Sequence, residues 1–329
     1  MNQSPQLVRD IGEQGLLKRL QGYCCPEVVG DDGAVLEIAA GQSLVVTTDV
    51  LVEQVHFSDR TTSPEDVGWR SVAANLSDLA AMGASPLGIT VGLSIPGHLS
   101  VSWVESLYQG MVNCAGKYHT GILGGDISRN EVITIAITAL GQVVPSRVIR
   151  RNAAQPGDAI VVSGVHGASR AGLELLLNPE WGQALDAQAQ DFLRKCHGQP
   201  QPRLDVLPYL WAVKGDRSVA GMDSSDGLAD AVLQICGCSG VGAEIEADAI
   251  PKVETLSPEL ALEWALYGGE DFELVLCLPK QPALALVELL GPRAAVIGKI
   301  TPSQKVILFG SKGFDEGRVL SLTEGFQHF

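Results

Sequence analysis

The chain has 329 residues, of which 46% are hydrophobic and 19% charged, a composition typical of a well-packed globular protein. Its 38 acidic and 23 basic residues give a net charge of −15, which argues against sequence-independent nucleic-acid binding because that needs a basic surface. The first residues lack a basic region followed by an apolar stretch, and no apolar run approaches the roughly 20 residues that span a bilayer, so we expect neither a signal peptide nor a membrane segment.

Apolar, β-branched runs predict strands at several places along the chain. They are residues 44–50, 87–95, 132–144, 159–163, 272–278, 294–300 and 305–309. Helical patterns alternate with these runs, at 64–82, 100–118, 167–177, 203–213, 228–236 and 281–290. The polar, proline-marked segment 145–158 separates two mixed halves, so we expect two α/β or α+β domains, residues 1–148 and 149–329.

The helix predicted at 64–82 has the clearest end signals. Ser63 is its expected N-cap and Pro64 occupies the first helical position. Asp66 lies in the first turn, and Gly83 suits the position just after the helix ends.

Acidic residues recur beside Gly, Ser or Thr at predicted strand ends and turns, next to apolar runs. These stretches are GDDG (Asp31, Asp32), VVTTDV (Asp49), NLSDLAAMG (Asp78), LGGDIS (Asp126), GMDSSDGL (Asp223, Asp226) and GGEDFEL (Glu270, Asp271). Any one of them, taken alone, reads as a solvated surface group. Together they would be costly beside a core unless they are paired or bound to cations, and few basic residues lie nearby in the sequence.

Divalent cations with oxygen ligands would satisfy this set, to which Thr47, Thr48 and Ser225 could add oxygens. Mg²⁺ is favoured over Zn²⁺ because the seven cysteines have no zinc-type spacing, and we expect them to be reduced thiols of a cytoplasmic protein. Magnesium held by few carboxylates completes its shell with water and substrate phosphates, so a phosphate-containing ligand is predicted. The common phosphate-binding loops are missing, which leaves GGD at 124–126 and SSDGLAD at 224–230 as the expected glycine-rich turn and helix N-terminus.

A series of motifs resembles the thiamine-monophosphate kinases in order and in approximate spacing. The motifs are GDDGAVL, TTDVLVEQVHF, NLSDLAAMGASP, GGDISR, DSSDGL and YGGEDFEL, and the C-terminal EGFQHF is also similar. The wider superfamily includes aminoimidazole ribonucleotide synthetase, selenophosphate synthetase and a hydrogenase-maturation protein. The resemblance, from about residue 28 to 329, implies a two-domain fold like that of aminoimidazole ribonucleotide synthetase. In that fold an N-terminal α/β domain dimerises and builds the nucleotide site, and an α+β domain follows.

The resemblance also implies roles for individual residues. The implied magnesium ligands, for several ions, are Asp32, Thr47, Thr48, Asp49, Asp78, Asp126, Asp223 and Asp226. The implied ATP contacts are Gly125, Asp126, Arg151, Ser225 and Tyr118, with Asp126 and Arg151 as catalytic residues. The implied contacts to thiamine monophosphate are His56, Glu270 and Phe326, the last at a position where the family often has tyrosine. Without the resemblance, each of these residues also has a purely structural interpretation. His56 could be a half-buried histidine, Glu270 a turn residue, Arg151 a solvated linker charge and Phe326 a residue at the edge of the core.

The implied reaction transfers the γ-phosphoryl group of ATP, in line and with Mg²⁺, to thiamine monophosphate, giving thiamine diphosphate. The acceptor phosphate, with a second pKa of about 6, is already mostly ionised at neutral pH, so no general base is needed. Arg151 would steady the transferring group or clamp the bound phosphates, and both roles stay open. The alternatives are another ATP-dependent synthetase of the superfamily, a metal-dependent phosphatase, and a nucleotide- or metal-binding protein without catalysis.

Overall fold

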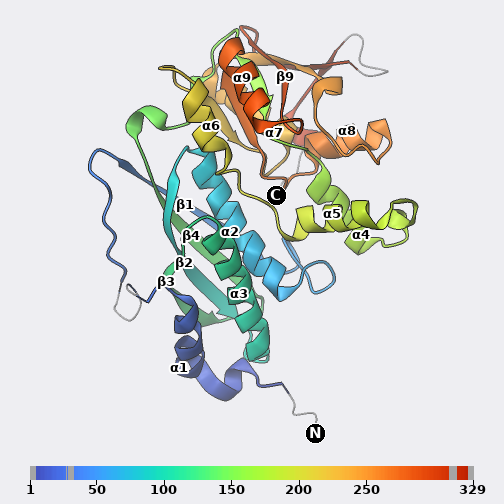
Figure 1. Cartoon of the computed structure of the whole chain (residues 1–329). Coiled ribbons are helices and arrows are strands. Elements are labelled where there is room, and N and C mark those ends of the chain that lie inside the picture. Colours follow the sequence, from blue (N-terminus) through green and yellow to red (C-terminus); the bar gives the residue numbers. More distant parts are fainter. Residues whose placement is uncertain (1–4, 27, 29–32, 311–316, 325–329) are drawn as a thin grey trace. The chain divides into compact units, whose positions relative to one another are not determined.

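The computed structural model describes residues 5–26, 28, 33–310 and 317–324. The chain divides into two compact units, Met1–Leu79 with Ser85–Val143, and Ala80–Ala84 with Val144–Phe329 (Figure 1). The predicted domains, 1–148 and 149–329, differ from these units at 80–84 and at 144–148. As independently folding domains they stay a prediction.

The first unit is built on a four-stranded sheet. Its strands are β1 (Ser43–Val52), β2 (Ser85–Ile95), β3 (Ile122–Arg129) and β4 (Thr134–Val143), in the order β1-β4-β2-β3. β2 and β3 pair in parallel, and the other neighbours are antiparallel. Helices α2 (Pro64–Ala81) and α3 (Val101–Lys117) lie along one face of the sheet, and α1 (Val8–Leu20) lies beyond one end of it (Figure 1).

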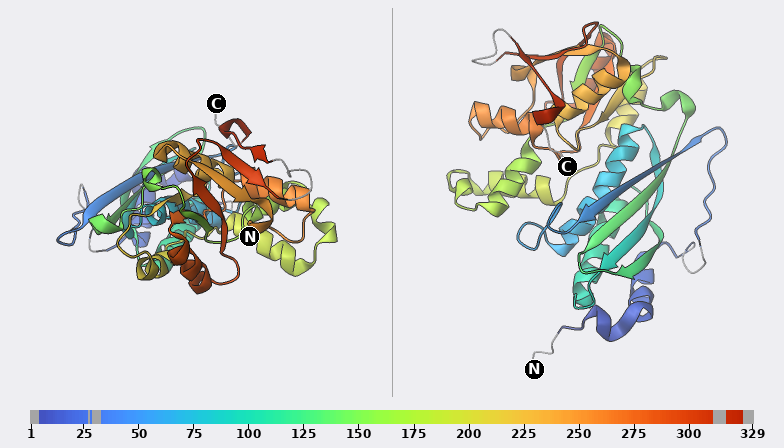
Figure 2. Two further views of the ribbon diagram at one scale, coloured as in Figure 1. Left: turned by 90° about the horizontal axis from the view of Figure 1, so that it is seen from above. Right: turned by 180° about the vertical axis from the view of Figure 1, so that it is seen from behind.

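The two faces of this sheet differ in burial because side chains alternate along each strand. Ile135 and Ile137 on β4 are fully buried on the face that the helices cover. On the opposite face of β1, Leu44, Val46 and Val50 are 46%, 55% and 45% exposed. No helix in the described part of this unit covers that face, as the view from behind in Figure 2 shows. The sheet therefore leaves an apolar surface open on one side.

Helix α2 begins and ends as its sequence predicts. The Ser63 hydroxyl accepts a hydrogen bond from the Asp66 backbone nitrogen over 3.1 Å and donates one to the Asp66 carboxylate over 2.7 Å. Pro64 is the first helical residue. Gly83 has φ +73°, and a Cβ there would lie 2.6 Å from the Arg147 carbonyl oxygen, so only glycine fits. The predicted end signals are confirmed.

The second unit is built on a seven-stranded mixed sheet. Its strands are β5 (Ala159–Val162), β6 (Ala220–Asp223), β7 (Gly242–Glu246), β8 (Leu274–Leu278), β9 (Ala295–Thr301), β10 (Val306–Phe309) and β11 (Arg318–Val319). The order is β11-β10-β7-β9-β5-β8-β6, in which only the pair β7 and β10 is parallel among the described strands.

Helices cover both faces of this second sheet. Val161 and Leu276 pack in a core with α6 (Val206–Val213) and α9 (Lys280–Leu290). Their neighbours in the strands, Ile160 and Cys277, pack in another core with α7 (Leu228–Ser239) and α8 (Pro258–Tyr267). Helices α4 (Ala168–Leu177) and α5 (Ala187–Gly198) form a separate cluster, which a side chain of α8 also joins. The central strands are therefore apolar on both faces.

All seven predicted strands and all six predicted helices are present, with ends shifted by up to three residues. The prediction missed β3, β6, β7 and β11, and the helices α1, α5 and α8. It was wrong for GGD at 124–126, which lies inside β3 and is not a turn. It was right for SSDGLAD, where α7 begins at Leu228. Among the described residues, no helix is both long and apolar enough to cross a bilayer.

Candidate active site

Several predicted metal ligands of the first unit gather where β1 faces α2. The Thr47 hydroxyl donates a hydrogen bond to the Asp78 carboxylate. The Asp49 backbone nitrogen donates to Asn75 Oδ1 over 3.1 Å, and Asn75 is fully buried. Thr47, Asp49 and Asp78 are half-buried on the helix-covered side of the sheet. Asn75, which was not predicted, fixes the β1 backbone at this point.

Thr48 and Asp126 lie on the other face of the same sheet. The Thr48 hydroxyl is 2.8 Å from the Thr138 hydroxyl of β4. Asp126 is exposed. Across β2 and β4 it is in register with Val50 of β1, whose side chain is exposed on this face. Because β1 and β3 are opposite edge strands, about 14 Å separates their backbones at the usual strand spacing. Within this unit, the structure therefore does not bring Asp126 together with Asp49.

Gly125 lies in the edge strand β3, and Tyr118 lies at the end of α3, before that strand. A Cβ at Gly125 would lie 2.1 Å from the Val91 carbonyl oxygen, so the close pairing of β2 and β3 requires glycine. Tyr118 follows the end of α3, and the Lys117 ammonium lies 5.5 Å from the centre of its ring. The ring therefore already has a cationic neighbour, which is the arrangement of a cation–π contact.

His56 is held by its own turn. Its Nδ1 accepts a hydrogen bond from the Val52 backbone nitrogen over 3.1 Å, and its backbone nitrogen donates to the Val52 carbonyl oxygen over 2.9 Å. An imidazole that accepts at Nδ1 carries its proton on Nε2. A neutral His56 is thus a hydrogen-bond donor at Nε2.

In the second unit, the 223–227 loop joins β6 to α7. Asp223 is almost fully buried at the end of β6, and its Oδ1 lies 3.4 Å from the Ser225 hydroxyl. The Ser224 hydroxyl is buried and has no hydrogen-bond partner within the described chain. Gly227, with φ +104°, precedes α7 and has no side chain with which to cap it. Polar oxygens, among them Asp226, thus gather at the start of a helix.

Arg151 is tied to helix α7, which follows this loop. Its Nη1 donates to Gln234 Oε1 over 2.6 Å, and Gln234 Nε2 donates to Asp230 Oδ2 over 2.6 Å. Asp230 lies in the first turn of α7. The exposed Arg151 side chain is therefore oriented by the helix that also carries the 223–227 loop.

The 268–273 loop leads from α8 into β8 and contains Glu270. Gly269, Glu270 and Phe272 have positive φ angles of +67°, +58° and +54°. The Glu270 backbone nitrogen donates to the Ser225 carbonyl oxygen over 2.6 Å. Its side chain is 34% exposed, with Oε2 3.9 Å from His197 Nδ1. The loop that carries a predicted substrate contact is thus bonded to the loop that carries predicted ATP and metal contacts.

Asp271 shows that a half-buried carboxylate of this set need not face a metal. It accepts hydrogen bonds from the backbone nitrogens of Gly167, over 2.6 Å, and Ser169, over 2.9 Å, at the start of α4. Burial raises the pKa of Asp271, and these backbone donors oppose that rise. The expectation that acidic residues without basic neighbours in sequence need cations is therefore wrong for Asp271, because helix amides satisfy it.

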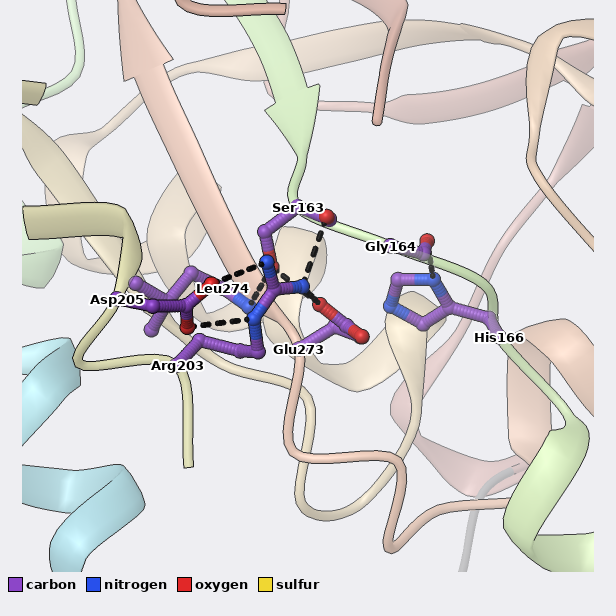
Figure 3. Close-up of polar contacts among 7 residues, drawn as sticks. All are labelled: Ser163, Gly164, His166, Arg203, Asp205, Glu273 and Leu274. Atoms are coloured by element: carbon purple, nitrogen blue, oxygen red, sulfur yellow. Dashed lines mark hydrogen bonds and ion pairs between the residues drawn. The ribbon is translucent and has the colours of Figure 1, made fainter. Parts of the chain in front are cut away.

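Glu273 and Arg203 form a second enclosed pair that the sequence analysis missed (Figure 3). The Glu273 carboxylate accepts from Arg203 and from the Ser163 hydroxyl, and Arg203 Nη1 also donates to the Ser163 carbonyl oxygen over 2.8 Å. Asp205 receives the other edge of the guanidinium over 3.0 and 3.1 Å. Burial raises the pKa of Glu273, and the Arg203 charge opposes it. Glu273 was visible in GGEDFEL, but nothing in the sequence joined it to Arg203.

The predicted magnesium site as a whole stays a prediction. Asp31, Asp32 and Phe326 lie outside the described residues. Within the described ranges, no group of three or more His, Cys, Asp or Glu side chains is placed so that it could hold a metal ion. The structure does place hydroxyl and carboxylate oxygens together at Thr47 and Asp78 and at Asp223 and Ser225. Such oxygen donors suit a hard cation such as Mg²⁺.

Comparisons with known proteins cover nearly all of the chain. Residues 30–143 match the family described as AIR synthase related protein, N-terminal domain, and residues 155–311 match the corresponding C-terminal domain. The thiamine-monophosphate kinase of Synechococcus elongatus is 52% identical over 329 residues, which is 99% of each chain.

Solved structures are similar in both fold and sequence. Thiamine-monophosphate kinase from Stenotrophomonas maltophilia has a TM-score of 0.78 and 33% identity, over 89% of this chain and 95% of that one. The structure described as AaThiL complexed with AMPPCP and TMP has a TM-score of 0.73 and 33% identity, over 94% and 97% of the two chains. With two AIR synthase related domains and full-length relatives of one kind, the chain belongs to the thiamine-monophosphate kinases, a family of ATP-dependent kinases.

Proposed function

We propose that the chain transfers the γ-phosphoryl group of ATP to thiamine monophosphate and forms thiamine diphosphate and ADP. The observation that supports this most directly is the hydrogen bond between the backbones of Glu270 and Ser225. It joins a proposed substrate contact to a proposed ATP contact within one unit, as transfer between two bound molecules requires. Membership of the kinase family supports the same reaction.

The proposed transfer is direct. The bond from the γ-phosphorus to the bridging oxygen of ADP breaks as a bond to a terminal phosphate oxygen of thiamine monophosphate forms. The acceptor phosphate, with a second pKa of about 6, needs no general base at neutral pH. The chain's task is then to align two anions and to offset their repulsion. Arg151, oriented by Gln234, is the cation that we assign to the transferring group.

Further residues are assigned to the two substrates and to magnesium as proposals. Those for ATP are Gly125, Asp126, Arg151, Ser225 and Tyr118, with Asp126 and Arg151 as catalytic residues, and those for thiamine monophosphate are His56, Glu270 and Phe326. The proposed magnesium ligands are Asp32, Thr47, Thr48, Asp49, Asp78, Asp126, Asp223 and Asp226. When bound, Mg²⁺ ions would neutralise and orient phosphate oxygens. His56 would donate from Nε2, since its Nδ1 accepts from Val52.

We also propose a homodimer that uses the open face of the first sheet. Leu44, Val46 and Val50 form an apolar row on the exposed face of edge strand β1. Exposed apolar strand surfaces are typical of protein interfaces. We place the enzyme in the cytoplasm, in agreement with its seven free thiols.

The test is an assay of the purified chain with ATP, Mg²⁺ and either thiamine monophosphate or thiamine. We expect thiamine diphosphate and ADP in equal amounts from thiamine monophosphate. Phosphate release without an acceptor would favour a metal-dependent phosphatase, and ATP binding without turnover would favour a binding protein. Retention of configuration at a chiral γ-phosphorus would contradict direct in-line transfer, since a single displacement inverts it.

A further inference from the structure

The 268–273 loop has a backbone that must be held by its surroundings. Glu270 and Phe272 have φ angles of +58° and +54°, a region that is costly for residues with a Cβ. Gly269 precedes them with φ +67°. Such conformations persist where neighbouring groups fix them, and they concentrate at functional sites.

Asp271 is the first anchor. Helix α4 begins after Gly167, which has no side chain to cap it. The Asp271 carboxylate accepts from the backbone nitrogens of Gly167 and Ser169 instead, although these residues lie 104 and 102 positions away along the chain. Helix α5 shows the ordinary arrangement, in which Asp186 accepts from the Ala189 nitrogen three residues on, over 2.7 Å. The cap of α4 therefore also fixes the backbone on the C-terminal side of Glu270.

Glu273 is the second anchor, two residues further along. Its side chain is only 15% exposed, and its carboxylate accepts from Arg203 and the Ser163 hydroxyl (Figure 3). The Ser163 hydroxyl also accepts from the Leu274 nitrogen over 2.7 Å, which ties β8 to the end of β5. A charged pair of this kind holds its place because breaking it would leave a buried charge.

The 268–273 loop is also hydrogen-bonded to the 223–227 loop. The Glu270 nitrogen donates to the Ser225 carbonyl oxygen over 2.6 Å, and the Ser224 nitrogen donates to the Glu273 carbonyl oxygen over 2.9 Å. A Cβ at Gly269 would lie 2.8 Å from the Ser225 carbonyl oxygen, so the backbones approach closely. A displacement of one loop therefore displaces the other.

We propose that Asp271 and Glu273 are positioning residues, which hold the Glu270 carboxylate and the 223–227 loop in one fixed arrangement. Neither residue is assigned to a substrate, and each acts through Glu270 and Ser225. The proposal rests on the proposed function, because it takes Glu270 as the contact to thiamine monophosphate. It gives the two carboxylates of GGEDFEL that follow Glu270 a role without metal.

The test compares full-length variants. Asp271→Asn and Glu273→Gln keep the shape of each side chain and remove its charge. The matched control is Asp186→Asn, which makes the same Asp-to-Asn change at the N-cap of α5, at the far end of that helix from His197. Each change is also made in a Glu270→Gln background. For each protein, kcat and KM for thiamine monophosphate are measured, and hydrogen exchange of the 223–227 and 268–273 loops is followed without substrate.

We expect Asp271→Asn and Glu273→Gln to lower kcat/KM roughly 10- to 100-fold, as a misplacement of about 1 Å does. The control should change kcat/KM by less than about twofold, because a cap distant from the site alters stability and not alignment. In the Glu270→Gln background, the effect of Asp271→Asn on kcat/KM should be clearly smaller, and the part that remains is the part exerted through the 223–227 loop. Exchange should become faster in both loops in Asp271→Asn and Glu273→Gln, and not in the control.

Each outcome supports or overturns the positioning role of Asp271 and Glu273. If the wild-type chain turns over, additive effects of Asp271→Asn and Glu270→Gln would overturn the proposal, and a non-additive effect would support it. If Asp271→Asn does not fold, the same cycle with Glu273→Gln decides. If the wild-type chain does not turn over, the proposed function fails by itself. Loop exchange then decides the positioning role, and unchanged exchange in both folded variants would overturn it.

Discussion

The Thr47 hydroxyl donates a hydrogen bond to the Asp78 carboxylate, which joins strand β1 to helix α2 among the proposed magnesium ligands. We expect Asp78→Asn to lower kcat by about 100-fold or more, as the loss of a preorganised charge in an active site does, and to raise the Mg²⁺ concentration for half-maximal rate. Thermal unfolding should change little, because Asn still accepts from Thr47. The control is Asp66→Asn in the first turn of α2. A near-normal rate of Asp78→Asn at limiting Mg²⁺ would refute the metal assignment.

Glu270→Gln should weaken binding of thiamine monophosphate and not of ATP. The carboxylate can attract the cationic thiazolium ring, and a hydrogen bond or contact to a charged group contributes about 1.5–3 kcal/mol, so KM for thiamine monophosphate should rise roughly 10- to 100-fold. Steady-state kinetics with each substrate varied in turn measures this. Glu263→Gln, an exposed residue of α8, is the control. An equal rise of both KM values would show that Glu270 acts on the fold of the loop and not on the substrate.

Gly125→Ala should destabilise the first unit by roughly 1–3 kcal/mol, the usual cost of an overpacked position. Its Cβ would lie 2.1 Å from the Val91 carbonyl oxygen, whereas a Cβ at the neighbouring Gly124 would meet nothing within 4 Å. Denaturant unfolding of Gly125→Ala and of the control Gly124→Ala measures the difference. Equal midpoints for the two variants would contradict the close pairing of β2 and β3.

Replacing Val46 and Val50 by Asp should convert the proposed dimer into a monomer. Two charges placed on an apolar strand surface would be buried without partners in an interface, at a cost of several kcal/mol. Sedimentation equilibrium at micromolar protein measures the change. Leu284→Asp, at an equally exposed leucine of α9, is the control. A monomeric wild-type chain, or a double variant that is still dimeric, would refute the interface.

His166 should make the fold sensitive to acid. Its ring is fully buried with Nδ1 3.1 Å from the Gly164 carbonyl oxygen, and burial lowers its pKa from 6.5 to about 4. Between these values the unfolded chain binds a proton that the folded chain does not, so stability falls as pH drops through this window. His166→Gln keeps a donor and does not titrate. Between pH 7 and 4, the free energy of unfolding of the wild type should fall by roughly 3 kcal/mol more than that of the variant. Parallel stability curves would contradict this.

The sequence predicted those helices and strands whose apolar periodicity and end signals agree with the structural propensity of their residues. Helix α2 has a serine cap, a proline start and a glycine end, and all of them appear in the structure. Strand β3 was missed because its sequence, ILGGDISR, contains two glycines and polar residues that disfavour strands. It forms because Gly125 allows close pairing with β2. Helix α5 was missed because its sequence, AQAQDFLRKCHG, is mostly polar and gives little apolar periodicity.

The candidate site was predictable in its residue types and not in its geometry. Motif spacing pointed to Asp49, Asp78 and Asp126, but no local pattern says that β3 and β1 would become opposite edges of one sheet. The hydrogen-bond donors to Asp271 and Glu273 come from segments between 70 and 110 residues away along the chain, at Gly167, Arg203 and Ser163. Long-range pairings of this kind depend on strand order, which composition and periodicity do not contain.

Helix α4 presents backbone amides at its first turn, a place where free phosphate groups commonly bind proteins. In this chain the place is already taken by Asp271, which is covalently tethered and so competes at a high effective concentration. A dissolved anion would have to displace the Asp271 carboxylate, which the chain holds next to these amides. The first-turn amides of α4 at Gly167 and Ser169 are thus occupied by a carboxylate of the chain itself, one residue from the proposed thiamine monophosphate contact, Glu270.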